Sequence, residues 1–203
     1  MAKVIYLDGD LPAGAKIKGA VAIDTEATGL SALRDRLCVV QLKGEGGDTY
    51  VVRVEAPYRC PNLKKILADP TREHIFHFAR FDIMMIKKCL GVDVPNIFCT
   101  RTASKLVRTY SDKHSLKTLV LELLGIEMDK TEQNSDWAAK KLSAAQINYA
   151  AGDVQYLHQL RAILGDMLKR EGREKLAKAC FAFIPHRAEL DIAGWETVDI
   201  FAH

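Results

Sequence analysis

Two acidic residues at alternate positions restrict the fold and the chemistry of this chain more than any other feature. Asp24 and Glu26 follow the hydrophobic run 21–23 and precede Thr28 and Gly29. If the run is a β-strand, its side chains alternate between the two faces, so both carboxylates point the same way. Two carboxylates that close repel each other and need a shared proton, a basic neighbour or a cation. The short pattern alone also fits an exposed strand end with two solvated acids.

The composition is that of one well-filled globular domain. The chain has 203 residues, 48% of them hydrophobic, and a net charge of +3 that is too small to identify a partner. Its five cysteines contain no C-x-x-C pair, which argues against a disulfide framework or a zinc ribbon and fits a reducing compartment. No run suits a signal peptide or a membrane span. We therefore expect one domain over 1–203, in the cytoplasm and without a membrane partner.

Hydrophobic periodicity divides the chain into a strand-rich first part and a helical second part. Three strands with short links, at 21–26, 37–42 and 49–54, predict an antiparallel meander. Other strands are expected at 4–7, 74–78 and 96–99, and helices at 61–68, 79–90, 101–110, 115–124, 143–170 and 173–183. Ser143 and Gln146 form a capping-box pattern before the long helix. This order predicts an α/β domain with a mixed β-sheet flanked by helices.

Three further residues suit the same chemistry. Asp82 is the only acid in a segment that is otherwise apolar or basic, and a buried acid needs a partner. A helix cap or a pair with Arg80 would also explain it. Tyr149 and Asp153 are four residues apart, so on a helix they share one face, beside the small residues 150–152. Alone, this pair also fits a packed tyrosine and a solvated aspartate.

The acids and the tyrosine together follow the order D-x-E, D, Y-x-x-x-D. This order resembles the DEDD exonucleases of the ribonuclease H-like fold, in the DEDDy subgroup that includes ribonuclease D. The resemblance includes 36–42, 135–137 and 142–157, and it covers roughly residues 21–160. Residues 108–112 and the tail from Glu189 are similar to a narrower group, the bacterial nano-RNase C enzymes. The resemblance implies a 3′–5′ exonuclease domain.

The resemblance also implies a two-metal mechanism. Two divalent cations, Mg²⁺ or Mn²⁺, would be held by four carboxylates, those of Asp24, Glu26, Asp82 and Asp153. The unperturbed pKa of tyrosine is about 10, too high for a strong base at neutral pH, so we expect Tyr149 to orient the attacking water. The expected reaction removes nucleoside 5′-monophosphates from the 3′ end of RNA.

Residues around the acids are candidates for binding the substrate. Thr28 and Gly29 form the turn after the first acidic motif, and Leu30 is similar to the family's apolar wedge that stacks against the terminal bases. An ordinary core leucine is the alternative for Leu30. His77 and Phe81 flank Asp82 in the sequence and are expected to line the same pocket, although a structural role fits His77 equally well.

A basic stretch from 101 to 117 is the candidate for holding phosphates. Arg101, Lys105 and Arg108 have the spacing of one helix face, and His114 follows them. Such a stripe can bind phosphates without sequence preference, or it can be a solvated face. If it grips the 5′ phosphate of a short oligonucleotide, it acts as a ruler of substrate length.

Three functions follow from these features. The first is a 3′–5′ exoribonuclease for very short, 5′-phosphorylated RNA, down to dinucleotides. The second is ribonuclease D-like trimming of tRNA or other structured RNA 3′ ends. Ribonuclease D carries an added helical domain after the exonuclease domain, and we expect this chain to end too soon for one, which favours short substrates. The third is an inactive nucleic-acid-binding scaffold, against which the retention of all five residues argues.

The last residues of the chain are too apolar for a free end. We expect 184–203 to pack on the domain or on a neighbouring subunit. The resemblance to nano-RNase C implies a homo-oligomer, an octamer.

Overall fold

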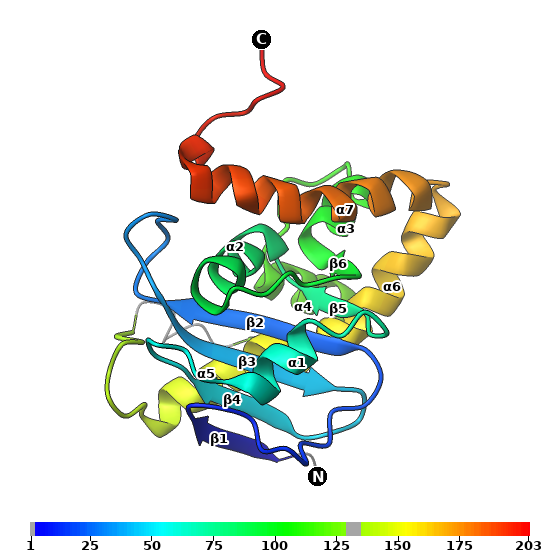
Figure 1. Ribbon diagram of the computed structural model, residues 1–203. Helices are drawn as coiled ribbons and strands as arrows, with labels where there is room; N and C mark the ends of the chain where they lie inside the picture. Colours follow the sequence, from blue (N-terminus) through cyan, green and yellow to red (C-terminus); the bar gives the residue numbers. More distant parts are fainter. Residues whose placement is uncertain (1–2, 129–134) are drawn as a thin grey trace.

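A six-stranded mixed sheet forms the centre of the molecule. The computed structural model describes residues 3–128 and 135–203 (Figure 1). The strands are β1 (Val4–Asp8), β2 (Val21–Ala27), β3 (Leu37–Gly44), β4 (Thr49–Arg53), β5 (His74–Phe76) and β6 (Ile97–Cys99), in the spatial order β1-β4-β3-β2-β5-β6. Strands β2, β3 and β4 pair antiparallel, which confirms the predicted meander, whereas β1 pairs parallel to β4 and β5 parallel to both β2 and β6.

Helices cover both faces of this sheet. They are α1 (Pro61–Leu67), α2 (Ala79–Met85) with its π-helical continuation η1 (Ile86–Leu90), α3 (Thr100–Val107), α4 (Leu116–Leu124), α5 (Ala144–Gln155), α6 (Leu157–Arg170), α7 (Glu174–Leu190) and η2 (Asp191–Trp195). All eight residues of β3 are buried because helices lie on either side of it. The mixed sheet flanked by helices is the predicted fold class.

The predicted long helix 143–170 is wrong in one respect, because Tyr156 divides it with φ −109° and ψ −1°. Its predicted start is right: the Ser143 hydroxyl accepts from the Gln146 N–H at 3.1 Å, and Gln146 Oε1 accepts from the Ser143 N–H at 2.9 Å. The division has a packing reason. Helix α5 lies against strands β1–β4, whereas α6 packs against α3, α4 and α7.

The hydrophobic interior consists of two clusters. The larger fills the space between the sheet and most of the helices. The smaller lies between the sheet and α5, and we call it the α5 cluster: Cys38, Val39, Val51, Trp137, Leu142, Ala150 and Ala151. Helix α5 contributes Ala150 and Ala151 to this smaller cluster, whereas Val154 near its C-terminal end belongs to the larger one.

Helix α7 is seven residues longer than the predicted 173–183 at its C-terminal end, since it runs to Leu190 despite Pro185. Its buried side chains Phe181, Ile184 and Ala188 continue the apolar face past that proline. The buried Asp191 accepts two hydrogen bonds of 2.7 Å from Arg80. The chain beyond η2 then extends away from the body (Figure 1), and Phe201 is 77% exposed. The first part of the apolar tail therefore packs on its own domain.

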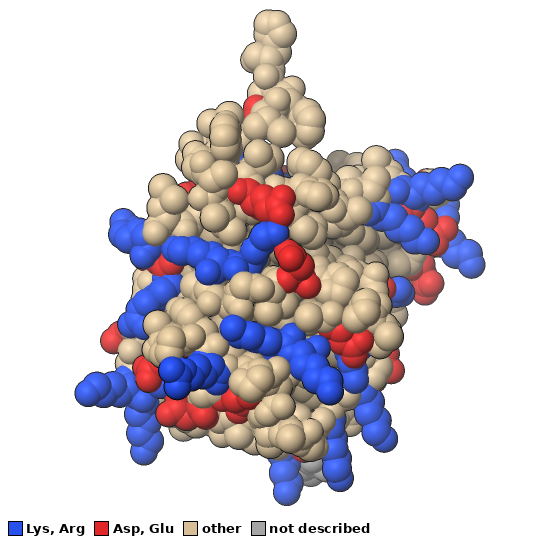
Figure 2. Space-filling model, in the orientation of Figure 1, with Lys and Arg blue, Asp and Glu red and all other residues tan. Residues whose placement is uncertain are grey.

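On the face shown in Figure 2, basic side chains do not form one continuous patch. Figure 2 shows Lys and Arg in separate groups, one of them where α6 meets α7, with acidic side chains between them. Among the described helices, none combines the length and the apolar character of a transmembrane span.

Candidate active site

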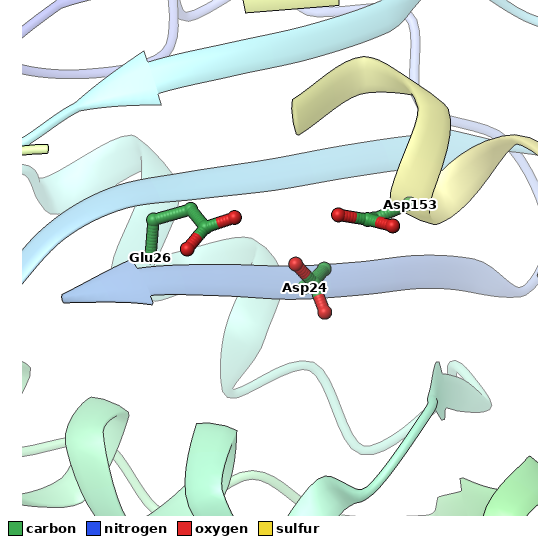
Figure 3. A group of neighbouring side chains, drawn as sticks. All are labelled: Asp24, Glu26 and Asp153. Carbon is green, nitrogen blue, oxygen red and sulfur yellow. The ribbon is translucent and has the colours of Figure 1, made fainter. Parts of the chain in front are cut away.

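Three carboxylates converge above β2. Figure 3 shows Asp24 and Glu26 on this strand and Asp153 on α5, with their carboxylates turned toward one another. One oxygen from each lies within 4.8 Å of the others. Strand alternation puts the first two on one face, opposite Gln41 and Val39 of β3. Helix α5 crosses that same face and supplies the third acid.

This oxygen-only cluster fits a divalent cation. Three carboxylates in so small a space repel one another, and a cation removes that repulsion. Mg²⁺ and Mn²⁺ both prefer oxygen ligands, whereas zinc sites commonly include sulfur or nitrogen. We call Asp24, Glu26 and Asp153 the acidic cluster.

Asp82 lies in the same cleft but outside the acidic cluster. Its buried carboxylate accepts a hydrogen bond of 2.7 Å from the Thr25 hydroxyl. Burial raises the pKa of Asp82 to about 8, and the charge of Asp153 acts in the same direction. Its two simpler explanations fail, because Arg80 pairs with Asp191 and the N-cap of α2 is Phe78. Burial therefore favours the protonated form of Asp82, and a bound cation would favour its charged form.

Tyr149 stands one turn before Asp153 on α5. Its ring packs against Trp137 with centroids 5.9 Å apart. Burial raises the pKa of the Tyr149 phenol above its ordinary value, and the charges of the acidic cluster raise it further. The phenol therefore stays protonated at neutral pH and is a hydrogen-bond donor, not a base.

A cleft of about 740 Å³ collects these groups. Besides the five catalytic candidates it is lined by most of the predicted substrate residues, Thr28, Gly29, Leu30, His77, Phe81 and Arg101. Leu30 is 77% exposed, so the alternative of a core leucine is wrong. His77 Nδ1 lies 2.9 Å from Thr100 Oγ1, which orients the ring. Segments from six separate parts of the chain, at 24–30, 77–82, 101, 115–117, 135–137 and 149–153, thus form one site.

Comparison with known proteins identifies the family. The sequence profile of the 3′–5′ exonuclease family matches residues 10–169. This chain belongs to that family. Over its full length this exonuclease is similar to Brucella melitensis NrnC bound to pGG, a nano-RNase C, with 48% identity, a TM-score of 0.95 and 100% coverage of both chains. It is also similar to Brucella melitensis NrnC with bound Mg²⁺, with 48% identity, a TM-score of 0.93 and 99% coverage of both chains.

Ribonuclease D is a more distant relative. The exonuclease is 37% identical to ribonuclease D of Gluconacetobacter diazotrophicus over 75% of its own chain. It spans only 39% of the length of that protein. The crystal structure of Escherichia coli RNase D is 25% identical, with a TM-score of 0.73 over 84% of this chain and 45% of that one.

The three basic residues of the predicted stripe do not form one exposed surface. Helix α3 ends at Val107, so Arg108 turns inward, is 1% exposed, and pairs with Glu122. His114 is buried too, with Nδ1 2.8 Å from Ser104 Oγ. Lys105 is exposed but does not line the cleft. Of the stripe, only Arg101 reaches the cleft, and a length ruler made of Arg101, Lys105 and Arg108 is therefore excluded.

Sequence reasoning missed several residues of the cleft: Phe78, Ser115, Lys117, Ser135 and Trp137. Phe78 is left-handed with φ 68°, is 44% exposed, and lies under the Arg101 guanidinium at 4.6 Å. The only sequence signal for Phe78 was that it is an aromatic residue next to His77. A positive φ cannot be predicted at a phenylalanine from the sequence. Lys117 belongs to the basic stretch 101–117, but helical spacing favoured Arg101, Lys105 and Arg108 as the residues that bind phosphate.

Asp35 holds the turn that carries Leu30. Its carboxylate accepts from the Ser31 N–H at 2.8 Å and from the Thr28 hydroxyl at 3.2 Å. The Ser31 hydrogen bond is the main reason that the pKa of Asp35 lies below its ordinary value. A Cβ on Gly29 would lie 2.5 Å from Asp35 Oδ2, so glycine is required for this contact rather than for a positive φ.

We therefore expect Gly29→Ala to lower kcat/KM by about ten- to a hundredfold, because displacing Asp35 moves the substrate turn. Gly14→Ala is the matched control, since its new Cβ meets nothing within 4 Å. Steady-state kinetics and the melting temperature of both variants check this. Equal activity of the two variants would show that the turn tolerates the displacement.

Proposed function

We propose that this exonuclease hydrolyses very short, 5′-phosphorylated RNA, down to dinucleotides, from the 3′ end and releases nucleoside 5′-monophosphates. The acidic cluster in a confined cleft carries the proposal. The cleft of about 740 Å³ has the size of a small-molecule pocket, roughly 300–1,000 Å³. The full-length similarity to an NrnC bound to pGG supports the same substrate class.

The chemistry of each residue in the cleft suits it to a different role in this reaction. The acidic cluster, with Asp82 beside it, would hold two divalent cations, Mg²⁺ or Mn²⁺, and these would supply charge that stabilises the attacking and leaving oxygens. The protonated Tyr149 hydroxyl orients the attacking water. Leu30 packs against the bases, and Arg101 and Lys117 attract the phosphates in the cleft.

Substrate length separates this function from its main alternative. Ribonuclease D-like trimming of structured RNA 3′ ends is favoured by the identity with ribonuclease D. We would follow purified protein with Mg²⁺ or Mn²⁺ on 5′-phosphorylated RNAs from a dinucleotide upward, with EDTA as the control. The dinucleotide is expected to disappear fastest. Trimming of long RNA while the dinucleotide persists would favour the alternative, and no cation-dependent turnover would favour a binding scaffold.

Tyr149→Phe is expected to lower kcat by about 100-fold and to leave cation affinity unchanged, because the variant loses the donor but no ligand oxygen. Turnover of the dinucleotide and a Mn²⁺ titration measure the two quantities. A loss of cation affinity would show that the phenol positions the ligands instead.

We also propose that the exonuclease is a homo-oligomer, an octamer by its resemblance to nano-RNase C. The exposed apolar side chains Trp195, Val198, Ile200 and Phe201 all belong to its last nine residues, and exposed apolar surfaces favour association. Light scattering of the full chain tests this, and a monomeric mass would contradict it. We place the activity in the cytoplasm, since five free cysteines fit a reducing compartment.

A further inference from the structure

The side-chain amide of Gln41 is buried without hydrogen bonds. The residue is 0% exposed, and neither Nε2 nor Oε1 has a partner. Among the described residues it is the only one for which both ends of a polar side chain are in this state. An unpaired buried amide costs free energy of folding, so its presence calls for an explanation outside stability.

The sheet register places this amide beside the acidic cluster. Gln41 lies on β3 directly opposite Asp24 of β2, and opposite Val51 of β4 on its other side. Residues directly opposite in an antiparallel pair share a face, with Cβ atoms about 4.5–5.5 Å apart. Gln41 therefore lies under α5, between Asp24 and the apolar α5 cluster.

The chemistry of the two neighbours is complementary. A glutamine amide offers two N–H donors, and an ionised carboxylate offers about four lone-pair sites to ligands and donors together. On its other side, Val51 has no side-chain polar group to offer. Carboxylates that ligate metals are commonly held in turn by a hydrogen bond from a neighbouring residue.

We infer that Gln41 is a positioning residue for Asp24, and that its Nε2–H donates to the Asp24 carboxylate when a divalent cation is bound. A bound cation would fix the Asp24 carboxylate, and the Gln41 amide, which has no hydrogen-bond partner here, would then have an acceptor. This inference rests on the cation site of the proposed function, but not on the identity of the RNA.

Gln41→Met tests this, because methionine keeps the length of the side chain and removes both polar atoms. We expect Mn²⁺ affinity to fall about tenfold, while the melting temperature in EDTA is unchanged or higher. Val51→Ala is the matched control, since it alters the other neighbour of Gln41. We expect it to lower the melting temperature and to leave Mn²⁺ affinity unchanged. Free Mn²⁺, measured by its electron paramagnetic resonance signal, gives the affinity without any substrate.

Two results for Gln41→Met would overturn the inference alone: unchanged Mn²⁺ affinity, or a melting temperature that falls together with affinity. A wild-type protein that binds no Mn²⁺ would overturn it together with the proposed function. If Gln41→Met does not fold, a crystal structure of the Mg²⁺-loaded wild type decides the question. Gln41 Nε2 within about 3.2 Å of an Asp24 oxygen supports the inference, and a longer distance refutes it.

Discussion

Asp153→Asn is expected to lower kcat/KM for a 5′-phosphorylated dinucleotide by about 10³-fold or more. Asp153 is the oxygen donor that α5 supplies to the acidic cluster, and a neutral amide removes a charge that a divalent cation requires. The fold should persist, because the packing of Ala150 and Ala151 and the capping box are untouched.

Asp166→Asn is the control for this variant, since Asp166 is an exposed acid on α6 that does not line the cleft. Its activity should match the wild type. Kinetics over a range of Mg²⁺ concentrations separates a weaker cation site from a slower reaction. Wild-type activity in Asp153→Asn would exclude Asp153 from the catalytic machinery.

Asp82→Asn is expected to abolish most activity while it stabilises the metal-free protein at pH 8. Burial raises the pKa of Asp82 to about 8 in the folded state, against about 3.9 in the unfolded chain. Between these values the folded state binds the extra proton, so the stability of the metal-free wild type falls as pH rises from about 4 to 8. The asparagine side chain does not titrate, and its oxygen can still accept from the Thr25 hydroxyl.

The measurement is the melting temperature of the wild type and of Asp82→Asn in EDTA from about pH 4 to 8. The wild type should lose stability toward pH 8 relative to Asp82→Asn, and Mg²⁺ or Mn²⁺ should restore it by binding the ionised acid. Asp166→Asn controls for the removal of one negative charge. Parallel curves for the wild type and Asp82→Asn would show that Asp82 is already ionised in the metal-free protein.

Local periodicity was enough to predict which face of its strand or helix each pair of candidate catalytic residues occupies. The period of two placed Asp24 and Glu26 on one face of β2, and the spacing of four placed Tyr149 and Asp153 on one face of α5. That these pairs meet across more than a hundred residues followed from the resemblance to a family. No short-range sequence pattern predicts the contact between the pair on β2 and the pair on α5.

The failures arose where tertiary contacts override spacing. Arg108 has the spacing of a basic helix face but turns inward to Glu122, because α3 ends one residue before it. The break at Tyr156 follows from the different surfaces that α5 and α6 cover. The distinct position of Asp82 depends on its bond to Thr25, a residue 57 positions away.

The separate α5 cluster has a consequence for how the enzyme loses activity. Helix α5 carries Tyr149 and Asp153, yet apart from Val154 its buried apolar side chains pack in the small α5 cluster and not in the main core. Proteins can unfold locally, and a region with few buried contacts unfolds at a lower free energy than the whole domain. As the urea concentration rises, α5 should therefore unfold and activity should be lost before the sheet unfolds. Amide hydrogen exchange would record this as weaker protection in α5 than in β3.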